Sequence, residues 1–235
     1  MAAPGILYAL IILSAIVVAV VLQRRSPHRL AVTARQRAII GLGAFCGAMI
    51  GAKLPFVLAD WDGLMSGRAW FDNGKTIMFG MVGGYFGVEL AKVVADVRQK
   101  TGDSFAVPAA VAIAIGRLGC FQAGCCFGCE TNLPWGVKFG DGLRRHPTQI
   151  YEALFHFAAA GMLFLLQRRG LFRTQLIKLY FISYFVYRFL SEFIRPEARL
   201  WLGLTGYQWA ALAFIPLFAG LWWHDRERTL PARAL

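Results

Sequence analysis

An uncharged apolar run lies near the start of the chain: GILYALIILSAIVVAVVL, residues 5–22. A helix needs roughly 20 such residues to cross about 30 Å of hydrocarbon, so this run predicts a membrane-spanning helix. A cleaved signal peptide is the alternative. It is disfavoured because positive charge follows the run instead of preceding it, and because no small-residue cleavage site is present.

Similar apolar runs recur along the rest of the chain. Hydrophobic residues make up 57% of the 235 residues and charged residues only 16%, and their grouping is typical of a polytopic membrane protein. Further spans are expected at residues 38–58, 76–96, 104–123, 147–167, 176–194 and 207–223. We therefore expect an all-α protein with seven transmembrane helices, which forms one integral membrane domain over residues 1–235.

Basic residues are concentrated after alternate spans. They follow the first, third, fifth and seventh spans: Arg24, Arg25, Arg29, Arg35, Arg37, Arg98, Lys100, Arg168, Arg169, Arg173, Arg226, Arg228 and Arg233. By the positive-inside rule these segments are cytoplasmic, so the N-terminus is outside, the C-terminus is inside and residues 124–146 form a small exterior cap. The net charge of +12 is then explained by topology and by anionic lipid, and no nucleic-acid partner is expected.

Two arginines interrupt the apolar spans. Arg117 lies near the outer end of the fourth span, where a guanidinium can bind phosphate through two hydrogen bonds or can snorkel to the interface. Arg188 lies within the sixth span, and Tyr184 and Glu192 are four residues away on the same helical face. Such charges inside a membrane are costly unless they are paired or used on a substrate. Together the two arginines predict a clamp for a lipid phosphate.

A polar segment begins the fifth span. Histidine exchanges protons near neutral pH, so His146 is a candidate proton acceptor, and a capping role before Pro147 is the alternative. Gln149, Tyr151 and Glu152 follow in the first helical turns. They are either substrate contacts or members of a structural hydrogen-bond network.

Four cysteines, Cys120, Cys125, Cys126 and Cys129, follow Arg117 in a C-x4-C-C-x2-C pattern. Disulfides or packed free thiols are favoured in an exterior segment. Thiol redox chemistry and metal binding are the alternatives, but the pattern lacks the two separated C-x2-C pairs that are usual for zinc, so no metal site is assigned. Cys46 is expected to be a small core residue of the second span.

Glycines form a stripe in the third span. Gly80, Gly83, Gly84 and Gly87 are three or four residues apart, which places them on one helical face. Such a stripe allows close approach of a second helix. The alternative is an opening for a lipid chain or headgroup.

These motifs, in this order, resemble those of the prolipoprotein diacylglyceryl transferase family. Residues 116–128 are similar to its signature G-R-x-G-N-F-I-N-G-E-x-W-G, and residues 146–154 to its H-P-x-Q-L-Y-E-A-L. Residues 184–197 match its Y-x3-R-F-x2-E-F-x-R-x-P-[DE] run, and Tyr8 resembles a tyrosine near the start of its first helix on a short match.

The resemblance implies a bacterial inner-membrane enzyme that needs no cofactor. Its partners are membrane lipids, phosphatidylglycerol as donor, and the lipobox cysteine of an exported preprolipoprotein, or another thiol, as acceptor. The implied catalytic residues are Arg117, Arg188, Glu192, Tyr184 and His146. The implied substrate contacts are Gly83, Gly84, Gly119, Gly124, Gly128, Gln149, Tyr151, Glu152 and Tyr8.

Several positions differ from the family pattern. Val82 replaces the histidine of a His-Gly-Gly motif, and Cys120, Ala123 and Cys125 replace Asn, Asn and Glu of the signature. Either His146 or Glu152 then takes the proton of the acceptor thiol, or the acceptor is acidic enough by itself. Two other functions stay open: a related membrane enzyme with another acceptor or cysteine-based thiol chemistry, and a lipid-binding protein without catalysis.

Overall fold

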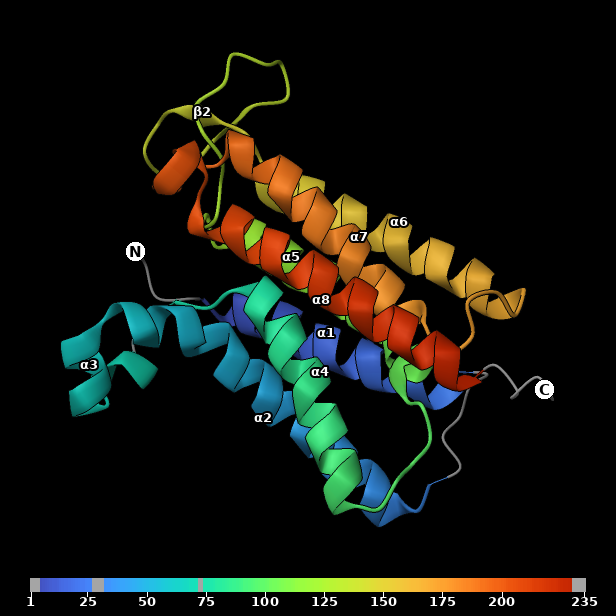
Figure 1. The fold of residues 1–235 in the computed structure, drawn as a ribbon. Coiled ribbons are helices and arrows are strands. Elements are labelled where there is room, and N and C mark those ends of the chain that lie inside the picture. Colours follow the sequence, from blue (N-terminus) through green and yellow to red (C-terminus); the bar gives the residue numbers. More distant parts are fainter. Residues whose placement is uncertain (1–4, 27–31, 72–73, 230–235) are drawn as a thin grey trace. The chain divides into compact units, whose positions relative to one another are not determined.

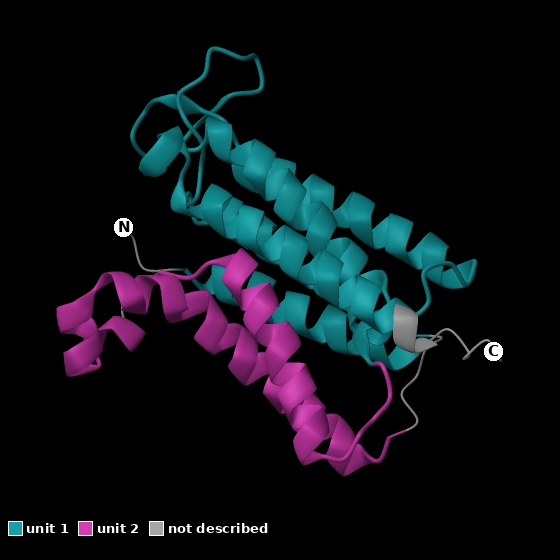
Figure 2. Ribbon diagram, in the orientation of Figure 1, with its two compact units in different colours: residues 1–29, 101–235 teal, residues 30–100 magenta. Residues whose placement is uncertain are grey.

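The computed structural model describes residues 5–26, 32–71 and 74–229. The chain divides into two compact units, one of Leu30–Lys100 and one of Met1–Arg29 with Thr101–Leu235 (Figure 2). Each expected span contains a long helix among the described residues: α1 (Ile6–Arg25), α2 (Ala34–Ala59), α4 (Ile77–Val94), α5 (Gly102–Gln122), α6 (Thr148–Arg168), α7 (Leu176–Ser191) and α8 (Gly206–Thr229). The helical fold class is confirmed.

Five of the described helices, α1, α2, α4, α5 and α6, are long and apolar enough to cross a membrane. Large apolar side chains such as Leu42, Leu90 and Leu154 are exposed on them, as expected for contact with lipid. Helix α7 has 16 residues and carries the buried charges Lys178 and Arg188. The seven crossings and the sides on which the termini lie stay predictions.

In the unit of residues 30–100, α2 packs along α4 through glycines; α3 (Trp61–Ser66) and the short helix η1 (Arg68–Trp70) follow α2. A Cβ atom at Gly47 would lie less than 3.0 Å from the Gly83 carbonyl oxygen, and one at Gly87 would meet the Gly43 carbonyl equally closely. A Cβ at Gly84 would lie 3.4 Å from the Ala48 Cβ. The glycine stripe is therefore a helix contact, and both Gly83 and Gly84 belong to it.

The other unit is built around α5, which packs against α1, α6 and α7, while α7 packs against α8 (Figure 1). The face of α5 that packs is lined by Ala106, Ala110 and Ala114, each 0% exposed. This spacing of three or four residues continues to Arg117, which is also buried. The helical repeat thus carries a charged side chain into the interior.

The same rule applies to the neighbouring helices. On α6 the buried stripe contains Gln149, Glu152 and His156, and on α7 it contains Tyr184 and Arg188. Polar residues therefore occupy core positions on three helices that contact one another. Buried polar groups need partners, so these stripes predict a shared polar network.

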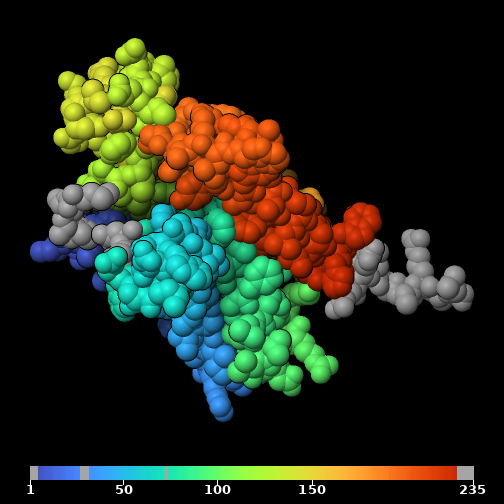
Figure 3. All heavy atoms as spheres, turned by 60° about the vertical axis from the view of Figure 1, so that its left-hand side comes forward, coloured from blue at the N-terminus to red at the C-terminus, as the bar shows by residue number. Residues whose placement is uncertain are grey.

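Residues 124–146 form a protrusion at one end of the α5–α8 bundle (Figures 1 and 3). It contains a two-stranded antiparallel hairpin, β1 (Val137–Lys138) and β2 (Arg144–Arg145). Arg145 Nε donates to Asp141 Oδ2 at 2.5 Å, and this hydrogen bond lowers the pKa of Asp141. The protrusion is the segment predicted as the exterior cap.

The α2–α4 contact predicts a large effect of side-chain size at Gly47. Gly47→Leu places a side chain against the Gly83 carbonyl, and overpacking of this kind costs about 1–3 kcal/mol. The midpoint of thermal unfolding in detergent should fall by about 4–8 °C. Gly41→Leu on the same helix meets open space and serves as control. Equal midpoints for the two variants would contradict the packing.

Candidate functional site

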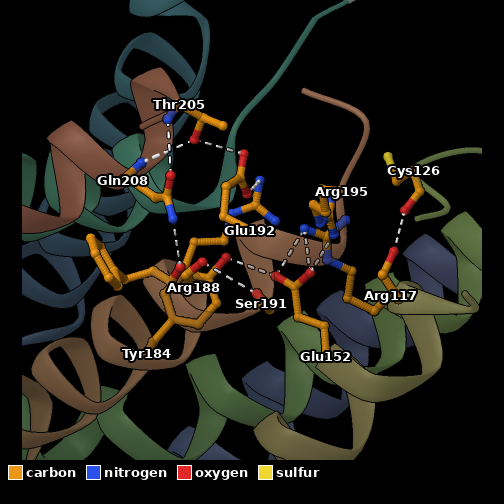
Figure 4. A network of polar contacts seen from close by, with 12 residues as sticks. Arg117, Cys126, Glu152, Tyr184, Arg188, Ser191, Glu192, Arg195, Thr205 and Gln208 are labelled. Carbon is orange, nitrogen blue, oxygen red and sulfur yellow. Dashed lines mark hydrogen bonds and ion pairs between the residues drawn. The ribbon is translucent and has the colours of Figure 1, made fainter. Parts of the chain in front are cut away.

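A buried carboxylate, Glu152 near the start of α6, lies at the centre of a polar network (Figure 4). Its Oε1 accepts hydrogen bonds from Arg117 Nη2 at 2.8 Å and from the Tyr184 hydroxyl at 2.7 Å. Its Oε2 accepts one from Arg195 Nη2 at 3.0 Å and lies 2.8 Å from Arg117 Nη2. Glu152 is 1% exposed. One side chain thus connects α5, α6, α7 and the segment after η2 (Glu192–Ile194).

A second ion pair is drawn in the same view (Figure 4). Arg188 Nη2 lies 2.8 Å from Glu192 Oε2, and Thr205 Oγ1 donates to Glu192 Oε1 at 3.1 Å. The backbone N–H of Thr205 donates to Gln208 Oε1 at 2.9 Å. The Arg188 guanidinium lies over the Tyr207 ring, 4.6 Å from its centroid. Arg188 is therefore fixed by a carboxylate and by an aromatic face.

The buried charges of this cluster are unequal. Three arginines, Arg117, Arg188 and Arg195, are at most 8% exposed, and they face the two buried carboxylates of Glu152 and Glu192. Burial lowers the pKa of the Arg195 guanidinium, and the charge of Arg188 lowers it further. One positive charge is in excess among these five side chains. An anion bound here would compensate it.

Each of the three arginines also has a buried nitrogen without a hydrogen-bond partner within the described structure. These nitrogens are Arg117 Nε, Arg188 Nη1 and Arg195 Nε. An unsatisfied buried donor typically costs about 1–3 kcal/mol, and more when it is charged. A ligand with several acceptor oxygens, such as a phosphate, would satisfy them.

His156 lies next to Glu152 on α6, and it is not among the site residues predicted from the sequence. It is 0% exposed, and its Nδ1 lies 2.8 Å from the Tyr180 hydroxyl. Its Nε2 lies 3.9 Å from Glu152 Oε1. The available signal was its position four residues after Glu152, on the same face of α6. Arg195 lies in the segment 184–197 that resembles the family motif, but the sequence predicts no role for it.

His146 belongs to a different group of contacts at the start of α6. Its Nδ1 lies 3.3 Å from the Tyr151 hydroxyl, to which Trp135 Nε1 donates at 2.8 Å. A Cβ atom at Gly128 would lie 2.6 Å from the Ile194 carbonyl oxygen and 2.8 Å from the His146 Cβ. Gly128 therefore allows the first part of the protrusion to pack tightly against its last residue, His146, which is half-buried.

The cysteine loop is attached to the first turn of α6. Gln149 Nε2 donates to the Cys125 carbonyl at 2.5 Å, and Thr148 Oγ1 donates to the Cys126 carbonyl at 2.7 Å. The sulfur atoms of Cys120, Cys125 and Cys126 all lie within 4.8 Å of one another. The cysteines are free thiols in the structure, which corresponds to the free-thiol alternative and not to disulfides. Cys46 is exposed on α2, so the prediction that it is a core residue is wrong.

The other predicted contacts lie at two places. Gly119 packs on α1, because a Cβ atom there would lie 3.5 Å from the Tyr8 ring. Gly124 has a φ of 64° and turns the chain after α5. The structure thus joins Arg117, Glu152 and Tyr184 directly, and places Gly83 and Gly84 in the α2–α4 unit.

Comparisons with known proteins agree on one family. The family model for prolipoprotein diacylglyceryl transferase matches residues 6–224. A phosphatidylglycerol–prolipoprotein diacylglyceryl transferase of Clostridium tetani is 34% identical over 173 residues, which cover 69% of this chain and 68% of the relative. A protein of the same name from Wolbachia sp. subsp. Brugia malayi is 36% identical over 177 residues, which cover 68% of this chain and 67% of the relative.

A third relative extends the similarity over more of the chain. The transferase of the same name from Geobacter sulfurreducens is 29% identical over 237 residues, covering 90% of this chain and 86% of the relative. The matched region contains the buried arginines and carboxylates described above. The chain belongs to the prolipoprotein diacylglyceryl transferase family.

Proposed function

We propose that this chain is a phosphatidylglycerol–prolipoprotein diacylglyceryl transferase. It transfers a diacylglyceryl group from the lipid to a cysteine thiol of an exported prolipoprotein. The observation that carries the proposal is the cluster of three buried arginines. Each has a nitrogen without a hydrogen-bond partner among the described residues, and their excess positive charge suits a lipid phosphate. The names of the relatives support the same reaction.

The reaction is a displacement at a glycerol carbon. The acceptor sulfur forms a bond to this carbon, the bond from carbon to the phosphate oxygen breaks, and glycerol phosphate leaves with the electron pair. Negative charge therefore grows on the leaving phosphate. Fixed positive groups in a site that excludes water stabilise such charge most strongly, and we assign this role to Arg117, Arg188 and Arg195.

The two carboxylates hold these arginines in position. Glu192 fixes Arg188, and Glu152 fixes Arg117 and Arg195. Tyr184 donates to Glu152 and so positions it. Because Glu152 already accepts hydrogen bonds from three side chains, it suits orientation better than proton transfer.

We assign proton transfer from the acceptor thiol to His146. It is half-buried at the end of the protrusion, where an exported peptide can approach. The remaining predicted residues at this end of the unit are assigned to the surroundings of the lipid and the peptide: Gly119, Gly124, Gly128, Gln149, Tyr151 and Tyr8.

We further propose seven membrane crossings, with the N-terminus outside, in the cytoplasmic membrane of a bacterium. Helix α1 ends in Arg24 and Arg25, and α6 ends in Arg168 with Arg169 next to it. Positive segments of this kind stay in the cytoplasm. In this topology α5 begins on the cytoplasmic side, and the loop that contains Cys125 and Cys126 follows its other, exterior end. The polar network lies near this end and therefore toward the exterior, where prolipoproteins arrive.

The arginine cluster predicts a large loss of activity when one member is truncated. Purified protein is incubated with phosphatidylglycerol vesicles and a lipobox peptide, and the thioether product and released glycerol phosphate are quantified. Arg117→Ala, Arg188→Ala and Arg195→Ala should each lower kcat/KM by about 100-fold or more, the loss typical for a preorganised donor. Arg195→Lys should fall between wild type and Arg195→Ala, because lysine keeps the charge but not the planar fork.

Arg98→Ala is the matched control, since the Arg98 side chain is 96% exposed. Activity of the three alanine variants at the level of this control would exclude a phosphate clamp. Absence of thioether product, while another family member is active in the same assay, would overturn the proposed function.

Glu152 predicts a stability effect that is separate from activity. Glu152→Gln keeps the shape but leaves Arg117 and Arg195 without their carboxylate, and breaking a buried ion pair costs about 3–5 kcal/mol. Thermal unfolding in detergent should begin about 10 °C lower. Adding Arg117→Met should restore part of the loss, because it removes an uncompensated charge.

Glu130→Gln provides the control for this series, because the Glu130 side chain is 64% exposed and its ion pair is long, at 4.0 Å. If Glu152→Gln and Glu130→Gln unfold at the same temperature, Glu152 does not hold the network together.

A further inference from the structure

Three cysteines at the end of α5 form a cluster that the phosphate site does not use. Cys120 lies in the last turn of α5, and Cys125 and Cys126 lie in the loop that follows. Their three sulfur atoms are within 4.8 Å of one another. When three thiolates bind zinc with bonds of about 2.3 Å, their sulfur atoms are about 3.8 Å apart. The sulfur separations thus exceed those of such a site by at most about 1 Å.

The backbone explains how two adjacent cysteines can both face Cys120. Gly124 and Cys126 have φ values of 64° and 63°, so the backbone is in the left-handed region on each side of Cys125. A non-glycine residue in this left-handed region costs roughly 1–2 kcal/mol, and the conformation must be held by other contacts. The hydrogen bonds from Thr148 and Gln149 to the two cysteine carbonyls supply them.

The surroundings of the cluster are positively charged. Arg117 precedes Cys120 by three residues, so the two side chains share a face of α5. Cationic neighbours stabilise thiolates, which are the form that binds metal. Cysteine thiolates select soft or borderline ions such as Zn²⁺ and Cu(I).

We propose that Cys120, Cys125 and Cys126 bind one Zn²⁺ and leave one coordination position open for the thiol of the acceptor protein. A site with three protein ligands and an open fourth position is the usual arrangement of catalytic zinc. The use of the open position rests on the proposed transferase function. The metal-binding site itself does not.

In this arrangement the acceptor thiol gives its proton to His146, as in the proposed function, when it coordinates the metal, because a coordinated thiol is deprotonated. Its sulfur then forms the bond to the glycerol carbon while the carbon–oxygen bond to the phosphate breaks. Glycerol phosphate leaves with the electron pair, and the three cysteines keep the metal. Arg117 of the phosphate site and Cys120 of the metal site are about one helical turn apart along α5.

The first test measures metal binding alone. Full-length protein, purified in detergent and reduced, is titrated with Co²⁺ and then with Zn²⁺, while sulfur-to-cobalt charge-transfer absorption is recorded. One ion per chain should bind. Cys120→Ser, Cys125→Ser and Cys126→Ser should each weaken binding by more than about 100-fold, since even changes outside the ligands cost about 10–100-fold.

Cys129→Ser and Cys46→Ser are the matched controls and should bind like wild type. Absence of the charge-transfer band, or an equal band in the triple Cys→Ser variant, would overturn the site. So would a non-reducing mass measurement that finds two of the three cysteines bridged in the freshly prepared protein.

The second test separates the metal site from the transferase function. A lipobox peptide added to the cobalt-loaded protein should shift the charge-transfer band, whereas the same peptide with serine for cysteine should not. No shift would overturn coordination of the acceptor. Metal binding without any thioether product would count against the transferase function alone, and full transferase activity in Cys126→Ser would count against the catalytic use of the metal alone.

Discussion

The unit of Met1–Arg29 and Thr101–Leu235 depends on one buried carboxylate. Glu152 accepts hydrogen bonds from Arg117, Tyr184 and Arg195, and these three side chains come from different elements. A single buried ion is expensive, and it is tolerated only when its partners are held in good geometry. The positions of α5, α6, α7 and the chain after η2 are therefore coupled, and so is the geometry of the proposed phosphate site.

The cluster is stabilised only in part by its own members. Two carboxylates hold three arginines, and one nitrogen of each arginine lacks a hydrogen-bond partner among the residues that the structure describes. This imbalance is unfavourable in the empty protein, but it becomes useful when a phosphate supplies the missing acceptors and charge. The thiol cluster follows Arg117 along the chain, so α5 and the loop after it carry one arginine of the proposed donor site and the proposed acceptor site.

The sequence predicted the helices and the polar segments but not their pairing. The apolar runs gave every long helix, and the helical spacing of Tyr184, Arg188 and Glu192 indicated a shared face. It did not show that Tyr184 and Arg195 meet Glu152, since these contacts join residues 32 and 43 positions apart. The convergence of the three thiols depends on two positive φ angles, which no spacing rule predicts.

We expect the buried arginines to bind a lipid phosphate. This binding is tested most directly by the thermal unfolding midpoint of the protein in neutral detergent during titration with phosphatidylglycerol, compared with diacylglycerol, which has the same chains but no phosphate. A ligand that binds only the folded state raises this midpoint. If the arginines bind the phosphate, the midpoint should rise with phosphatidylglycerol alone, and Arg117→Ala should lose this rise. Equal rises with both lipids, or a rise that Arg117→Ala retains, would contradict it.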